Sequence, residues 1–105
     1  MHSMTTKLAG VTFDQCQENI KLYGPPSFST FELNREPDNP YDSNAIWVGI
    51  GHYKFGYIPK HQAVTLSAKM DEGMAFIAES ACVNRSAYHG TVGMTVTVKE
   101  IQYTC

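Results

Sequence analysis

Alternating apolar and polar residues mark several stretches of the chain as half-buried β-strands. The last stretch is the clearest, because Met94, Val96 and Val98 alternate with polar residues at the two-residue period of a strand. Phe31 and Leu33 repeat this pattern earlier in the chain. From such patterns we predict strands at residues 7–13, 27–35, 45–50, 54–58, 74–83 and 93–102.

Two short helices are predicted between these strands. The first begins at Asp14, where Gln17 three residues later completes a capping-box pattern, and ends before Gly24. The second begins with Pro59, whose missing N–H costs nothing in the first helical turn. Gly73 is the expected end of this second helix.

The order of these elements predicts a mainly β domain. Short antiparallel strands in a chain of 105 residues favour a small closed barrel over a sandwich, because closure removes exposed strand edges. Residues 37–44 and 84–90 are polar and rich in turn formers, so we expect loops there. We predict one domain over residues 7–105, preceded by an extension over residues 1–6 in which the native start is Met4.

Composition and charge narrow the classes of function. Eight Lys and Arg against ten Asp and Glu give a formal charge of −2, which argues against a protein that coats long duplex DNA. A pocket for one or two nucleotides remains compatible with this charge, because aromatic stacking contributes to such binding. The four histidines and three cysteines show no metal-binding spacing, so neither a metal nor another cofactor is expected.

The cellular location and the absence of catalysis are predicted from targeting and catalytic motifs that the sequence does not contain. We interpret Cys16, Cys82 and Cys105 as free thiols in a reducing compartment. The sequence contains no apolar run of membrane-spanning length and no signal-peptide core, which predicts a cytoplasmic protein without membrane contact. No motif supplies a nucleophile with its base, or a phosphate-binding glycine loop, so we expect a non-catalytic domain.

Three motifs occur in a characteristic order along the chain. They are Gly10-Val11-Thr12-Phe13, Arg35-Glu36-Pro37-Asp38-Asn39-Pro40-Tyr41-Asp42-Ser43-Asn44-Ala45-Ile46, and Gly56-Tyr57-Ile58-Pro59-Lys60. Together they resemble the HIRAN domain, which occurs in helicase-like fork-remodelling ATPases and as free-standing bacterial proteins. The resemblance extends from roughly Leu8 to Val98, and the central motif is its most specific part. It implies an OB-like barrel.

This resemblance also implies a ligand and a role for individual residues. The ligand is the 3′ end of single-stranded DNA in repair, replication or mobile-element processes, and the partner protein is a separate helicase or nuclease. The resemblance implies that Phe13 and Tyr41 stack on terminal bases and that Asp42 accepts a hydrogen bond from the 3′-hydroxyl. It also implies that Asn39 and Lys60 contact the DNA backbone and that Tyr57 and Tyr88 line the site.

Two aspects of these implied roles can be examined chemically. An ionised aspartate accepts hydrogen bonds and cannot donate them, so Asp42 suits a free hydroxyl and would repel a terminal phosphate. The eukaryotic module has an arginine and a histidine where this chain has Thr12 and Tyr57. Two potential phosphate donors of the family are therefore changed here.

Alternatives remain open for several residues and for the function. A turn held by Asx side-chain bonds explains the composition of residues 38–44 by itself, so ligand contact by Tyr41 or Asp42 rests on the resemblance. Phe13 and Trp47 are expected in the core by default, and Lys60 can be a solvated residue of the first helical turn. The alternative function is a protein-interaction domain that binds a peptide in the same aromatic groove or at a barrel edge. The acidic net charge slightly favours this alternative, whereas the Tyr41-Asp42 pair favours DNA, and the salt dependence of binding separates the two.

Overall fold

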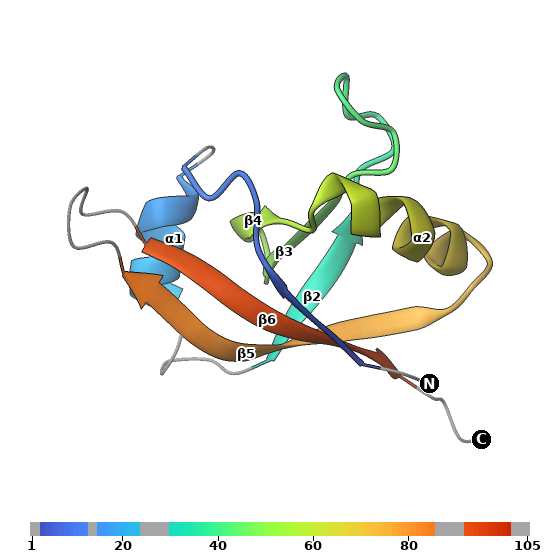
Figure 1. Ribbon diagram of the computed structural model, residues 1–105. Helices are drawn as coiled ribbons and strands as arrows, with labels where there is room; N and C mark the ends of the chain where they lie inside the picture. The colour runs from blue at the N-terminus through green and yellow to red at the C-terminus, as the bar shows by residue number, and fades with distance from the viewer. Residues whose placement is uncertain (1–2, 13–14, 24–29, 86–91, 102–105) are drawn as a thin grey trace.

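Six strands and two helices form the described part of the chain. The computed structural model describes residues 3–12, 15–23, 30–85 and 92–101, with only the backbone at positions 80, 81 and 85. The elements are β1 (Met4–Lys7), α1 (Cys16–Tyr23), β2 (Thr30–Arg35), β3 (Ile46–Ile50), β4 (Tyr53–Tyr57), α2 (Lys60–Asp71), β5 (Ala75–Arg85) and β6 (Val92–Ile101). The strands form one antiparallel sheet in the order β1-β6-β5-β2-β3-β4 (Figure 1).

The sheet closes where the chain leaves β1 and meets β4. The amide of Ala9 donates to the carbonyl of Tyr57, and the amide of Tyr57 donates to the carbonyl of Ala9, each over 2.8 Å. Gly56 permits this approach, because a Cβ atom there would lie 2.9 Å from the carbonyl oxygen of Ala9 and 3.0 Å from Cγ1 of Val11. We call this Ala9–Tyr57 pairing the seam. It confirms the predicted barrel of six antiparallel strands with two short helices.

The barrel interior contains the hydrophobic core. Phe31 and Phe55 are each at most 1% exposed, and their rings meet edge to face with centroids 5.0 Å apart. On β6 the alternating residues Met94, Val96 and Val98 are fully buried, as their spacing predicts. Burial of these apolar side chains is the main contribution to the stability of the barrel.

The first strand differs from its predicted position. Instead of residues 7–13, β1 spans Met4–Lys7, so part of the expected N-terminal extension pairs with β6. The chain leaves β1 because the amide of Leu8 bonds to the carbonyl of Met94, after which Ala9 crosses to β4 and Gly10 takes a positive φ of 64°. Leu8 and Ala9, which were predicted as strand residues, therefore form a crossing between β6 and β4.

Both helices start differently from the prediction. Gln17 uses its amide to hold α1 on the barrel, donating to the carbonyls of Val11 and Val92 and accepting from the amide of Val92. Its expected capping partner, Asp14, lies outside the described residues. Pro59 precedes α2 as its N-cap, one position before the predicted one. Across the described ranges, neither helix is long and apolar enough to cross a membrane.

Candidate nucleic-acid interface

A pocket of about 650 Å³ lies between the loop that joins β2 to β3, strand β4, and Gly10, which follows the seam residue Ala9. This volume is within the range of ordinary small-molecule sites. Its described lining consists of Gly10, Glu36, Asn39, Pro40, Tyr41, Lys54 and Tyr57. Because these residues come from separate parts of the chain, the closure of the barrel is what assembles the pocket.

The loop over residues 36–45 projects from the ends of β2 and β3 (Figure 1) and is held by side-chain bonds to its own backbone. Oδ1 of Asn39 accepts from the amides of Tyr41 and Asp42 over 2.8 and 3.1 Å. Oδ1 of Asp42 accepts from the amide of Asn44 over 2.9 Å. These bonds are the Asx turns that the composition of the loop predicts. They fix the backbone on both sides of the Tyr41 ring.

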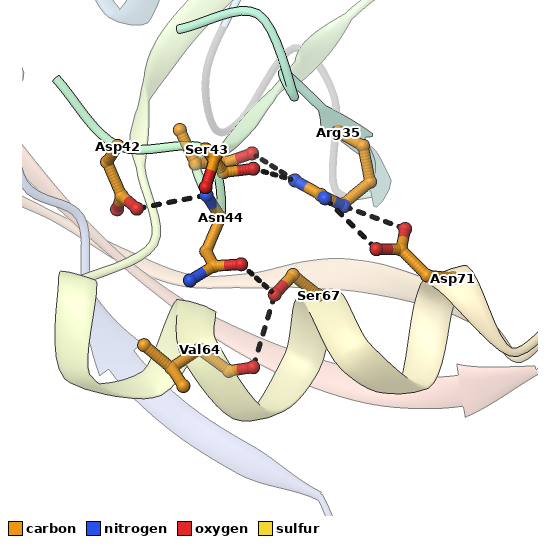
Figure 2. A network of polar contacts seen from close by, with 8 residues as sticks. Arg35, Asp42, Ser43, Asn44, Val64, Ser67 and Asp71 are labelled. Carbon is orange, nitrogen blue, oxygen red and sulfur yellow. Dashed lines mark hydrogen bonds and ion pairs between the residues drawn. The ribbon is translucent and has the colours of Figure 1, made fainter. Parts of the chain in front are cut away.

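The base of the loop is fastened to α2 by Arg35 (Figure 2). The guanidinium donates to the carbonyls of Ser43 and Ala45 and makes a bidentate pair with Asp71, over 3.0 and 3.1 Å. This hydrogen bonding to Asp71 raises the pKa of Arg35 and lowers that of the Asp71 carboxyl. Arg35 therefore joins both strands of the loop base to one helix.

A second fastening beside Arg35 links Asn44 to Ser67, which is 1% exposed (Figure 2). The Ser67 hydroxyl lies 3.2 Å from Oδ1 of Asn44 and 3.1 Å from the carbonyl of Val64. Asn44 also donates its backbone amide to Asp42. Polar contacts from Asp71 and Ser67 of α2 therefore hold Arg35 and Asn44 at the base of the loop, and Asn44 in turn bonds to Asp42.

We expect Arg35→Gln to lower the free energy of unfolding by about 1–2 kcal/mol, because the loop carbonyls lose a charged donor. Urea denaturation measures this loss. The matched control is Lys99→Gln, which removes an ion pair to Glu79 whose two side chains are 49% and 46% exposed. Such exposed pairs contribute little, so the control should keep the wild-type midpoint. Equal midpoints for the two variants would contradict the fastening role of Arg35.

Four side chains of the pocket, two of them charged, form a hydrogen-bonded cluster. Nζ of Lys54 lies 2.7 Å from the Tyr57 hydroxyl, which donates to Oε1 of Glu36 over 3.0 Å. Nζ also lies 3.4 Å from Oε2 of Glu36, and the side-chain amide of Asn39 donates to Oε1 over 2.6 Å. The Lys54 and Glu36 side chains are 19% and 29% exposed, so the cluster is partly shielded from water.

The environment of this cluster fixes its charges at neutral pH. Burial opposes ionisation of Glu36, but hydrogen bonds from Asn39 and Tyr57 and the charge of Lys54 lower its pKa below the ordinary value. Burial likewise disfavours the ammonium of Lys54, yet Tyr57 and Glu36 raise its pKa above the ordinary value. Burial and Glu36 raise the pKa of the Tyr57 phenol. The pocket therefore presents a carboxylate, an ammonium and a neutral phenol.

A bulge in β4 brings Lys54 into the pocket. In the register between β3 and β4, Val48 pairs with Gly56 and the next residue, Gly49, pairs with Lys54. Phe55 is therefore the extra, unpaired residue of the bulge. Without the bulge, the two-residue period would place Lys54 and Tyr57 on opposite faces of the strand. With it, both lie on one face.

Trp47 of β3 lies on the face that carries Lys54. Trp47 pairs across the strands with Tyr57, and the centroid of its ring lies 5.6 Å from Nζ of Lys54. The expectation that Trp47 belongs to the core was wrong. It is half-buried on the opposite face from its fully buried neighbours Ile46 and Val48, as strand alternation requires.

The structure brings together some of the predicted site residues. Asn39, Tyr41 and Tyr57 line the pocket, and Tyr41 is 90% exposed. Asp42 follows Tyr41 in the loop, with one carboxylate oxygen bonded to the amide of Asn44, and does not line the pocket. Lys60 is an exposed residue at the first position of α2, also outside the pocket lining.

The other predicted residues, Phe13 and Tyr88, lie outside the described part of the chain. Glu36 and Lys54 are the charged pocket residues that sequence reasoning missed. Glu36 is part of the central motif but had no role assigned to it. For Lys54 the sequence offers only Gly49, Gly51 and Gly56 near a short hairpin as a sign of irregular pairing.

Comparisons with proteins of solved structure or recognised family agree with this fold. The family model of the HIRAN domain matches residues 7–100. The crystal structure of the HIRAN domain of human HLTF is 23% identical, with 93% of this chain and 74% of that chain covered and a TM-score of 0.64. A protein from Lactobacillus plantarum is 20% identical, with 95% and 100% covered and a TM-score of 0.65. No curated protein sequence matches. The chain therefore belongs to the HIRAN domain family, a family of DNA-binding modules.

Proposed function

We propose that this domain is a non-catalytic module that binds single-stranded DNA at its 3′-hydroxyl end. The observation that carries the proposal is the exposure of Tyr41: this residue is 90% exposed at a pocket although its backbone amide is fixed by a hydrogen bond to Asn39. An aromatic ring held in solvent gains nothing from packing in the free protein, whereas stacking on a base contributes about 1–3 kcal/mol. The family match supports DNA as the ligand.

In this proposal, Asp42 supplies the recognition of the end. Its Oδ1 atom accepts from the amide of Asn44, which orients the carboxylate beside Tyr41. A carboxylate has about four acceptor positions, so acceptance from a terminal hydroxyl does not require that this bond be broken. A 3′-phosphate at the same place would be repelled by the negative charge.

The proposed binding is local and modest in affinity. One or two base stacks and one charge-assisted hydrogen bond, reduced by the cost of association, give a dissociation constant on the order of micromolar. The formal charge of −2 also disfavours a long electrostatic contact with the DNA backbone. The domain would therefore act together with a separate helicase or nuclease in DNA repair or replication.

Fluorescence anisotropy with one labelled oligonucleotide, ending in either a 3′-hydroxyl or a 3′-phosphate, tests the proposal. We expect the hydroxyl end to bind about tenfold more tightly, because the phosphate meets the Asp42 carboxylate. Asp42→Asn keeps the side-chain oxygen that accepts from Asn44 but removes the charge, so it should abolish most of this preference.

Each other outcome excludes part of the proposal. Equal affinity for the two ends in the wild-type protein would exclude recognition of the 3′-hydroxyl. Absence of binding to either oligonucleotide at low salt would exclude single-stranded DNA as the ligand. The peptide-binding alternative would then be the better account of the exposed Tyr41 ring.

A further inference from the structure

We infer that Lys54 and Tyr57 form a subsite for one phosphate group of the bound strand, and that this phosphate replaces the contact between the Lys54 ammonium and Oε2 of Glu36. The inference rests on the proposed function and extends it from the terminal base and hydroxyl to the backbone of the ligand. It assigns a role to the cluster at the floor of the pocket.

The position of Lys54 distinguishes it from the other described basic side chains. Arg35 is bound to Asp71 at the loop base, and Lys99 is paired with Glu79 on the sheet. Among the described lysine and arginine residues, Lys54 is the one that lines the pocket together with Tyr41. A nucleotide that stacks on Tyr41 within this pocket would therefore meet this cation.

The distances within the cluster indicate which contact a phosphate would replace. Nζ of Lys54 is 2.7 Å from the Tyr57 hydroxyl but 3.4 Å from Oε2 of Glu36. Charge-assisted N–H···O bonds are ordinarily about 2.7–2.9 Å long, so the contact with Glu36 is a weak one. A phosphate oxygen would offer Lys54 a shorter bond while keeping the ammonium paired.

Tyr57 is suited to assist this exchange. Its hydroxyl accepts from Lys54 and donates its own proton to Oε1 of Glu36. Rotation of the hydroxyl would direct that proton to a phosphate oxygen next to Lys54. Glu36 would keep its bond from the Asn39 side chain, at 2.6 Å the shortest in the cluster, so it would not be left without a partner.

The aromatic surroundings hold the ammonium at the pocket. Nζ lies 4.8 Å from the ring centroid of Tyr57 and 5.6 Å from that of Trp47, both within the range of cation–π attraction. A side chain restricted in this way loses less conformational entropy on binding than a freely solvated lysine. Partial shielding from water also strengthens its attraction to an anion.

The test compares Lys54→Gln with wild-type protein by anisotropy on the 3′-hydroxyl oligonucleotide over a range of salt concentrations. We expect about a tenfold loss of affinity at low salt and a salt slope smaller by about one phosphate contact. Lys54→Arg retains the charge and should keep most of the slope. The matched control is Lys69→Gln, an exposed position on α2 outside the pocket lining, which should behave as wild type.

Failure of this inference can be told apart from failure of the proposed function. Wild-type protein that does not bind the oligonucleotide overturns both. Wild-type protein that binds, with an unchanged affinity and salt slope in a folded Lys54→Gln variant, overturns the phosphate subsite alone. An equal loss in Lys69→Gln would also overturn it, since the effect would then reflect overall charge.

A second variant decides the matter if Lys54→Gln does not fold. Glu36→Gln keeps an oxygen for the bonds from Asn39 and Tyr57 but removes the charge that competes with phosphate for Lys54. We expect it to bind the oligonucleotide several-fold more tightly than wild type at low salt. Unchanged or weaker binding would overturn the inference.

Discussion

Replacing Tyr41 with alanine should remove most single-stranded DNA binding while leaving the free energy of unfolding unchanged. Tyr41 is 90% exposed, so deletion of its ring creates no cavity and breaks no packing in the free protein. Loss of one base stack is worth about 1–3 kcal/mol, which corresponds to roughly a 5- to 150-fold weaker affinity. Anisotropy titration and urea denaturation of the same samples measure the two quantities.

Two further substitutions make the Tyr41 experiment specific. Tyr41→Phe retains a ring that can stack and should keep most of the affinity. Leu22→Ala removes another exposed apolar side chain, 63% exposed on α1, and should change neither quantity. If folded Tyr41→Ala bound the oligonucleotide as tightly as wild type, the assignment of the pocket would be wrong.

The second large effect is expected for Gly56→Ala, which should lower the free energy of unfolding by about 2–4 kcal/mol. The new methyl group would lie 2.9 Å from the carbonyl oxygen of Ala9 and 3.0 Å from Cβ of Leu8. Neither neighbour is the end of a flexible side chain, so the backbone must move, which costs about 1–3 kcal/mol. The two seam hydrogen bonds between Ala9 and Tyr57 would weaken in addition.

Gly93→Ala is the matched control, since Gly93 is also a strand glycine. A methyl group there first meets Cε of Lys7 at 3.3 Å, the outer part of a flexible side chain that can move aside. We expect a change below about 1 kcal/mol, with thermal or urea unfolding as the measurement. Similar losses in the two variants would show that closure at the seam has no special need for glycine.

Local periodicity predicted most of the strands but not the course of the chain around the seam. The alternation in β6 reflects one buried face, and the structure buries Met94, Val96 and Val98 as expected. Leu8 and Ala9 also looked like strand residues. Their pairing with two different strands, β6 and β4, depends on contacts between distant parts of the chain that no local pattern contains.

The candidate site was predicted only where a specific motif marked it. The central motif pointed to Asn39 and Tyr41 and the third motif to Tyr57, and all three line the pocket. Lys54 was missed because the bulge at Phe55 changes which strand residues share a face. Trp47 was assigned to the core because its apolar strand gave no information on which of its two faces is buried.

The loop over residues 36–45 separates the residues that hold it from those that it displays. Arg35 and Asn44 fasten its base to α2, whereas Pro40 and Tyr41 at its tip line the pocket and Tyr41 makes no packing contribution to the barrel. Substitutions at the tip can therefore alter the choice of ligand without weakening the scaffold. This arrangement makes the loop tip a suitable place to diversify residues in a library that seeks new binding specificities on an unchanged barrel.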